Sequence, residues 1–85
     1  MSRHFTVYGM PDCAGCEQSK NVLTARGESF NYVDIVAENY SQKRLMQEIG
    51  VSARSMPQII VRDSPDAETF SHLGGVDGLR KFLIL

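Results

Sequence analysis

Residues 5–16 read FTVYGMPDCAGC, and the architecture of the chain can be worked out from this stretch. Its first four residues are β-branched or aromatic and are followed by Gly9, which predicts a short strand over residues 5–8. Cys13 and Cys16 come next, at the start of a predicted helix. A Cys-x-x-Cys pair between a strand and a helix is typical of redox chemistry in a cytosolic protein.

The rest of the chain alternates helical and extended patterns that are separated by glycine and proline. Apolar side chains fall on both faces of residues 30–36, which predicts a strand covered by helices on two sides. The predicted strands are 5–8, 30–36, 58–61 and 69–73, and the predicted helices are 13–26, 41–49 and one from about Val76. The order βαβ, then α, then ββα predicts an α/β protein with a four-stranded mixed sheet and three flanking helices, which is the layout of the thioredoxin fold.

Length and charge narrow the possible functions. The chain has 85 residues, so we expect one domain spanning residues 1–85. The formal net charge is -1, without the basic excess of a nucleic-acid binder, and no apolar run is long enough to span a membrane. The first residues do not resemble a signal peptide. We expect a monomer in the cytoplasm, where cysteines stay reduced, with no nucleic-acid or membrane partner.

The Cys13–Cys16 pair has the properties of a redox dithiol. A cysteine in the first turn of a helix faces unpaired N–H groups and the positive end of the helix dipole, which stabilise its thiolate. We therefore predict that Cys13 is the exposed nucleophile. Cys16 lies one turn further on, at a Cα separation of roughly 5–6 Å that a disulfide accepts, so it can resolve a mixed disulfide formed at Cys13. The small Ala14 and Gly15 leave Cys13 open to a bulky substrate.

Other interpretations of these residues remain open at this point. The Asp12 carboxylate either opposes the thiolate or caps the N–H groups of the helix. A structural disulfide would close so short a loop that it contributes roughly 2 kcal/mol. A zinc site needs about four ligands, and the chain has two cysteines and two histidines (His4 and His72) without a second paired motif. We therefore expect no metal site, and we interpret His72 as a hydrogen-bonded structural residue.

Two further motifs are candidates for substrate binding. Pro57 opens a strand, either as a trans proline at a sheet edge or as a cis proline that turns the backbone of Met56 toward an extended substrate. Residues 74–77 read GGVD and join the last strand to the last helix. Glycines permit a close approach of the backbone to a ligand, and the start of the helix offers N–H groups to a carboxylate.

Taken together, these motifs resemble the glutaredoxin family over essentially the whole chain. The resemblance lies in VYG before CAGC (residues 13–16), RSMPQI at residues 54–59 and HLGGVDGL at residues 72–79. In its small size and its Met-Pro-Gln motif at residues 56–58, the chain resembles phage-encoded glutaredoxins that supply electrons to ribonucleotide reductase. The common Cys-Pro-Tyr-Cys is Cys-Ala-Gly-Cys here, and Met10 stands where the family usually has a lysine.

The resemblance also implies a site for glutathione. The backbone of Met56, beside a cis proline, would pair with the cysteinyl part of glutathione. Residues 75–77 would hold the γ-glutamyl end, and Arg54 would meet the glycyl carboxylate. The binding residues implied in this way are Arg54, Met56, Pro57, Gly75, Val76 and Asp77.

The expected function is that of a glutathione-dependent thiol–disulfide oxidoreductase. It would reduce protein disulfides, such as that of ribonucleotide reductase, or glutathione mixed disulfides, with glutathione as co-substrate and no tightly bound cofactor. Two alternatives stay open. Met10 and Gly15 replace residues that contact glutathione in the family, which favours a thioredoxin-like redoxin reduced by thioredoxin reductase. The small Ala14 and Gly15 would also suit a non-catalytic carrier of an iron–sulfur cluster. Tyr8 and Tyr32 are interpreted as packing residues.

Overall fold

The computed structural model describes residues 3–84 as four strands and three helices. In chain order these are β1 (His4–Gly9), α1 (Ala14–Ala25), β2 (Ser29–Asp34), α2 (Gln42–Ile49), β3 (Gln58–Arg62), β4 (Ser71–Gly74) and α3 (Val76–Ile84). The order βαβ, α, ββα is the predicted one, and the α/β class and thioredoxin fold are confirmed. Within residues 3–84, none of the helices is both long enough and apolar enough to cross a membrane.

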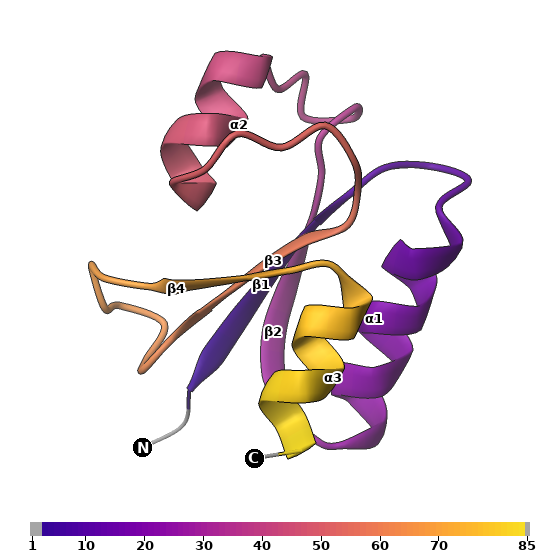
Figure 1. Ribbon diagram of the computed structural model, residues 1–85, viewed down its shortest axis with the longest axis vertical. Helices are drawn as coiled ribbons and strands as arrows, with labels where there is room; N and C mark the ends of the chain where they lie inside the picture. The colour runs from indigo at the N-terminus through magenta and orange to yellow at the C-terminus, as the bar shows by residue number, and fades with distance from the viewer. Residues whose placement is uncertain (1–2, 85) are drawn as a thin grey trace.

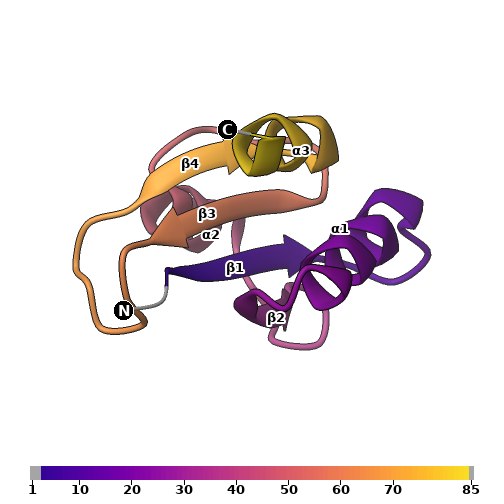
Figure 2. The ribbon, with the colours of Figure 1, turned by 90° about the horizontal axis from the view of Figure 1, so that it is seen from below.

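The strands form one mixed sheet in the order β2-β1-β3-β4, and Figure 2 shows them from below, running across the picture. β1 runs parallel to β2 and antiparallel to β3, and β4 pairs antiparallel with β3. β2 is therefore an edge strand. Its apolar side chains do pack on both faces, as predicted, but they are only partly buried because no strand covers its outer edge.

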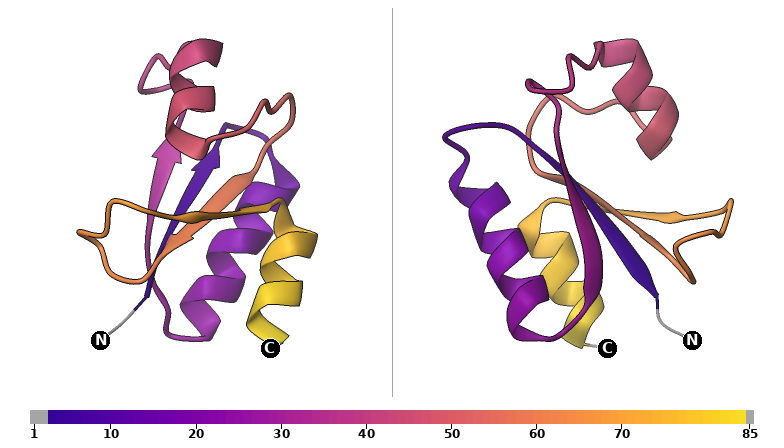
Figure 3. Two further views of the ribbon diagram at one scale, coloured as in Figure 1. Left: turned by 60° about the vertical axis from the view of Figure 1, so that its left-hand side comes forward. Right: turned by 180° about the vertical axis from the view of Figure 1, so that it is seen from behind.

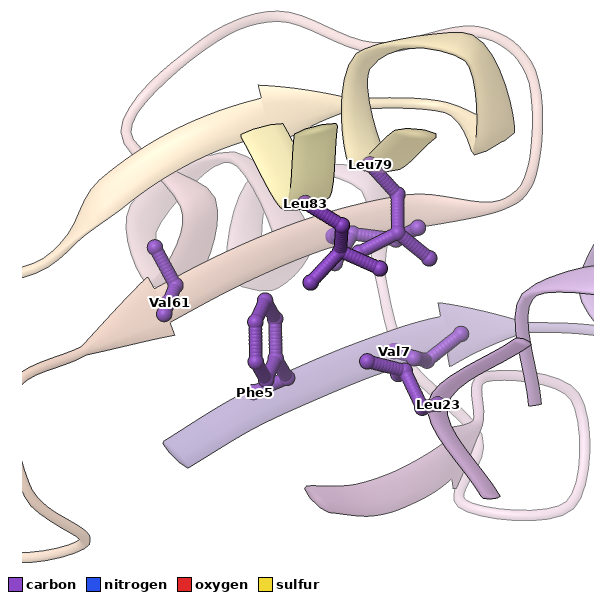
Figure 4. Packing of buried hydrophobic residues seen from close by; sticks show 7 residues of the cluster. Phe5, Val7, Leu23, Val61, Leu79 and Leu83 are labelled. Atoms are coloured by element: carbon purple, nitrogen blue, oxygen red, sulfur yellow. The ribbon is translucent and has the colours of Figure 1, made fainter. Parts of the chain in front are cut away.

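Helices cover both faces of the sheet: α1 and α3 lie together on one side and α2 lies on the other (Figures 1 and 3). Alternating strand residues supply the core beneath α1 and α3, where Phe5 and Val7 of β1 are fully buried. Figure 4 shows how the helices complete this core with leucines. Its buried members are Phe5, Val7, Leu23, Ile59, Val61, Leu79 and Leu83.

The opposite face of the sheet packs against α2 through a second core. Its buried members are Tyr8, Leu45, Ile49, Ala53 and Ile60. Ser41 caps the start of α2, since its side chain accepts a hydrogen bond from the Arg44 N–H. Gly50 ends the helix at a φ of 82°, a left-handed conformation that glycine adopts without steric cost.

A polar group at the rim of this second core ties α2 to β1. We call it the Glu48 cluster, and it consists of Tyr8, Tyr40, Arg44 and Glu48. Both tyrosine hydroxyls donate to the Glu48 carboxylate, at 3.0 Å from Tyr8 and 2.8 Å from Tyr40, and Arg44 Nε donates at 2.9 Å. Burial alone would raise the pKa of Glu48, but these hydrogen bonds together hold it below its usual value.

The last hairpin differs from its predicted boundaries. The sequence predicts a strand over residues 69–73, whereas β4 spans Ser71–Gly74. Phe70 instead lies in the turn and packs against the second core. Arg62 holds this turn from β3, donating to the Ala67 carbonyl at 3.0 Å and lying over the Phe70 ring. Phe70, which falls inside the predicted strand, therefore anchors a loop instead.

Candidate active site

Three segments that are distant in sequence meet at the end of the sheet where β1 stops and β3 begins (Figures 1 and 3). A Cβ atom on Gly15, at the start of α1, would lie 3.0 Å from Pro57 Cδ. A Cβ on Gly75, before α3, would lie 3.7 Å from the Pro57 carbonyl oxygen. The structure thus brings the cysteine motif, the proline loop and the glycine turn into one place.

Cys13 caps α1. Its backbone is extended (φ −119°, ψ 105°), and its Sγ accepts a hydrogen bond from the Cys16 N–H at 3.1 Å. This is the contact expected of a sulfur at a helix N-terminus, because the donor is one of the unpaired N–H groups of the first turn. Cys13 and Cys16 form a disulfide with a Cα separation of 5.2 Å, within the predicted range.

The two sulfurs differ in access. Cys16 is completely buried, whereas Cys13 is partly exposed. An incoming thiol or thiolate can therefore reach only the Cys13 side of the disulfide. The structure thus has the difference in accessibility that the sequence predicted, with Cys13 more exposed than Cys16.

Asp12 does not cap the helix. The capping residue is Cys13, and Asp12 precedes it as an exposed residue with a φ of 58°. A positive φ is uncommon outside glycine, although aspartate tolerates it better than most residues do. Of the two roles left open for Asp12, the structure thus removes the capping one.

The proline loop adopts the cis alternative, with a cis peptide bond between Met56 and Pro57. Pro57 is buried, and the Met56 side chain packs against the second core, on the α2 side of the sheet. Within residues 3–84 no hydrogen bond engages the Met56 N–H or carbonyl. Arg54 is exposed on the same loop and forms no hydrogen bond or salt bridge with the other predicted binding residues in the described part of the chain.

The glycine turn has its positive φ at Gly74, which takes 87°, and not at Gly75. Val76 and Asp77 form the first turn of α3, with Asp77 exposed and Val76 partly exposed. Gly75 faces the Pro57 carbonyl, as described above. Of the predicted residues in this segment, Gly75 is therefore the one that the structure places directly against the proline loop.

Tyr32 is a site residue that sequence reasoning missed. Both its hydroxyl and Cys16 Sγ lie against the point where a Gly9 side chain would begin, the sulfur at 2.8 Å, so both atoms border the space beside Gly9. Burial raises the pKa of Tyr32, and the Lys20 ammonium, 4.2 Å from the ring centre, opposes this in part. At neutral pH the hydroxyl therefore keeps its proton and is able to donate a hydrogen bond on the same side of Gly9 as the buried sulfur.

No metal centre emerges from the part of the chain that the structure describes, since no three His, Cys, Asp or Glu side chains there are grouped to hold an ion. A hollow of about 270 Å³ lies between the ends of α1 and α3, lined by Val22, Arg26, Arg80, Leu83 and Ile84. It is at the opposite end of α1 from Cys13, so it takes no part in the cysteine chemistry.

Comparisons with known proteins find the same fold. The family model described as glutaredoxin matches residues 5–64. Reduced Escherichia coli glutaredoxin is 24% identical with a TM-score of 0.74, and the match covers 95% of this chain and 93% of that one. The match to the glutaredoxin–glutathione complex of buckwheat is 19% identical with a TM-score of 0.67, over 94% of this chain and 67% of the other.

A redoxin with a thioredoxin-like activity profile has a similar fold. The glutaredoxin-like NrdH-redoxin of Escherichia coli, described as having a thioredoxin-like activity profile, is 18% identical with a TM-score of 0.66. That match covers 96% of this chain and 95% of the redoxin. No curated protein is similar enough in sequence to be matched.

Proposed function

The chain belongs to the glutaredoxin family, and we propose that it reduces disulfides through Cys13 and Cys16 with glutathione as its reductant. Membership of this family makes it a thiol–disulfide oxidoreductase with the Cys-x-x-Cys pair of such enzymes. The observation that supports the individual roles best is the hydrogen bond from the Cys16 N–H to the partly exposed Cys13 Sγ, above a fully buried Cys16.

The reaction follows from this asymmetry. The Cys13 thiolate attacks one sulfur of the substrate disulfide, forming a mixed disulfide and releasing the other substrate sulfur as a thiolate. The Cys16 thiolate then attacks Cys13 Sγ, which breaks the mixed disulfide and releases the second substrate thiol. The substrate has gained two electrons and the enzyme holds the Cys13–Cys16 disulfide, which is the state seen in the structure.

Two glutathione molecules restore the dithiol. The first attacks Cys13 Sγ, the accessible end of the disulfide, and frees Cys16 as a thiol. The second attacks the sulfur of the bound glutathione, releasing oxidised glutathione and the Cys13 thiolate. The two electrons thus come from two glutathione thiols.

We place glutathione between the proline loop and the glycine turn. The Met56 backbone would pair with its cysteinyl part, and Arg54 would attract the glycyl carboxylate. Val76 N–H, at the start of α3, and the Asp77 carboxylate would meet the γ-glutamyl carboxylate and ammonium. The relative that is a glutathione complex supports this placement at the level of the fold.

A second reductant has its own support. Met10 is exposed, at 41%, where the family usually has a lysine, and the fold matches a redoxin with a thioredoxin-like activity profile. The alternative is a redoxin reduced by thioredoxin reductase through the same two cysteines. Under either reductant we propose a cytoplasmic enzyme acting on disulfide-containing proteins such as ribonucleotide reductase.

Two coupled assays that follow NADPH oxidation separate these possibilities. One contains glutathione, glutathione reductase and a small glutathione mixed disulfide; the other contains thioredoxin reductase and a protein disulfide. We expect turnover in the first, and its loss in the Cys13→Ser variant. Turnover in the second assay alone would contradict glutathione as the reductant while leaving the cysteine roles intact.

A further inference from the structure

A chain of hydrogen bonds runs from β4 to the proline loop through a buried glutamine. Gln58 is the first residue of β3 and is 8% exposed. Its Oε1 lies 2.7 Å from His72 Nε2 on β4, and its Nε2 donates to the Ser55 carbonyl at 2.8 Å. Both ends of a buried amide are thereby engaged, one by a strand and one by the loop that carries Met56.

The direction of each hydrogen bond is fixed by the chemistry of the groups. A carbonyl oxygen only accepts, so the Gln58 nitrogen must face Ser55 and its oxygen must face His72. His72 Nε2 therefore carries a proton and donates. The imidazole is one end of a link whose other end is the Ser55 carbonyl, one residue before Met56.

The loop between α2 and β3 depends on such side-chain links. It has no regular secondary structure over residues 51–57. Two of its carbonyls accept from glutamine side chains: Ala53 from Gln42 Nε2 and Ser55 from Gln58 Nε2. The Gln58 link is the one nearest to Met56 and to the contact between Pro57 and Gly15.

We propose that His72 and Gln58 are positioning residues for the disulfide substrate. They hold the Met56 backbone in place so that it can pair with the backbone of the substrate's cysteine residue. Paired in this extended conformation, the substrate would have its sulfur next to Cys13 Sγ. The proposal rests on the proposed function. It gives His72 a role in substrate binding, in addition to the structural one predicted from the sequence.

The test compares three variants by steady-state kinetics in whichever coupled assay the wild-type protein supports. In His72→Leu and Gln58→Met the link is broken, and we expect KM for the disulfide to rise about five- to tenfold, the factor that one hydrogen bond is worth. In His72→Gln an amide N–H replaces the imidazole N–H, and we expect KM to return to within twofold of wild type. Alkylation of Cys13 in the reduced protein should keep its rate in all three, because the α1 N–H groups that stabilise its thiolate are untouched.

His4→Leu is the matched control. Like His72, His4 is a hydrogen-bonded histidine on a strand: its two ring nitrogens lie 2.8 Å from Ser29 Oγ and 2.8 Å from Asn31 Oδ1. Unlike His72, it lies at the end of β1 that is far from the cysteines. We expect a loss of thermal stability without a rise in KM. An unchanged KM in both His72→Leu and Gln58→Met would overturn the proposal, as would an equal rise in His4→Leu. Should His72→Leu fail to fold, Gln58→Met and His72→Gln decide. A wild-type protein inactive in both assays would instead count against the proposed function.

Discussion

Replacing Gly78 by alanine should destabilise the protein, although alanine is the better helix former. Gly78 lies in the first turns of α3, where α3 packs against the end of β4. A Cβ atom there would overlap the Leu73 carbonyl oxygen and lie 2.9 Å from the Leu73 carbonyl carbon. Both are backbone atoms, so no side-chain rotation relieves the overlap and α3 has to move away from the sheet.

The magnitude follows from two opposing terms. Helix propensity favours alanine over glycine by about 1 kcal/mol. Overpacking that shifts backbone costs roughly 1–3 kcal/mol or more, and here it also pulls the buried Leu79 and Leu83 from the core beneath α1 and α3. We expect a net loss of about 2 kcal/mol, which for a domain of this size lowers Tm by roughly 8–16 °C.

Urea denaturation of the oxidised protein, followed by circular dichroism, measures this loss. Gly75→Ala is the matched control at the same junction, since its Cβ would meet the Pro57 carbonyl oxygen at an ordinary 3.7 Å. We expect it to stay within about 0.5 kcal/mol of wild type. A Gly78→Ala protein as stable as wild type, or more stable, would refute the steric argument and show that propensity decides at this position.

Three further outcomes are expected. Glu48→Gln should cost about 1 kcal/mol at pH 7 because it weakens charged, partly solvent-screened hydrogen bonds. The lowered pKa of Glu48 means that its contribution is full above about pH 4.3 and lost as the pH falls through the folded value, so the urea midpoints of variant and wild type should converge as the pH is lowered below that range. Equal midpoints at pH 7 would contradict this. Tyr32→Phe should slow the attack of Cys16 severalfold, seen as a longer-lived mixed disulfide in rapid-quench mass spectrometry, with Cys13 alkylation unchanged; an unchanged lifetime would exclude a role for the hydroxyl. Arg54→Ala should raise KM for glutathione more at low salt than at high salt, and a salt-independent effect would argue against an ion pair.

The parts of the fold that the sequence predicted well depend on local signals. Gly27 and Gly50 mark helix ends, and the Cys-x-x-Cys motif falls at the start of α1, because caps and glycines act on their immediate neighbours. The strand predicted over residues 69–73 was misplaced because contacts with distant residues override the local signal there. Phe70 has high strand propensity, but its contact with the second core and with Arg62 fixes it in the turn.

The site residues that were missed depend on register. Tyr32 pairs with Val7 across β1 and β2, and a shift of one residue would turn its side chain to the other face of the sheet, away from Cys16. Gln58 reaches His72 across a β3–β4 pairing whose register shifts between Ile59 and Ile60. The local sequence pattern predicts neither the strand register nor its irregularity, so these contacts could be identified only from the three-dimensional structure.

The cysteine roles are tested most directly by trapping the intermediate. The reduced Cys16→Ser and Cys13→Ser variants are each incubated with oxidised glutathione, and the adduct is located by mass spectrometry of the intact protein and of its peptides. We predict one glutathione on Cys13 in the Cys16→Ser variant, stable until free glutathione is added. The fully buried Cys16 should acquire none in the Cys13→Ser variant. An adduct on Cys16, or the absence of one on Cys13, would contradict the assignment of Cys13 as the nucleophile.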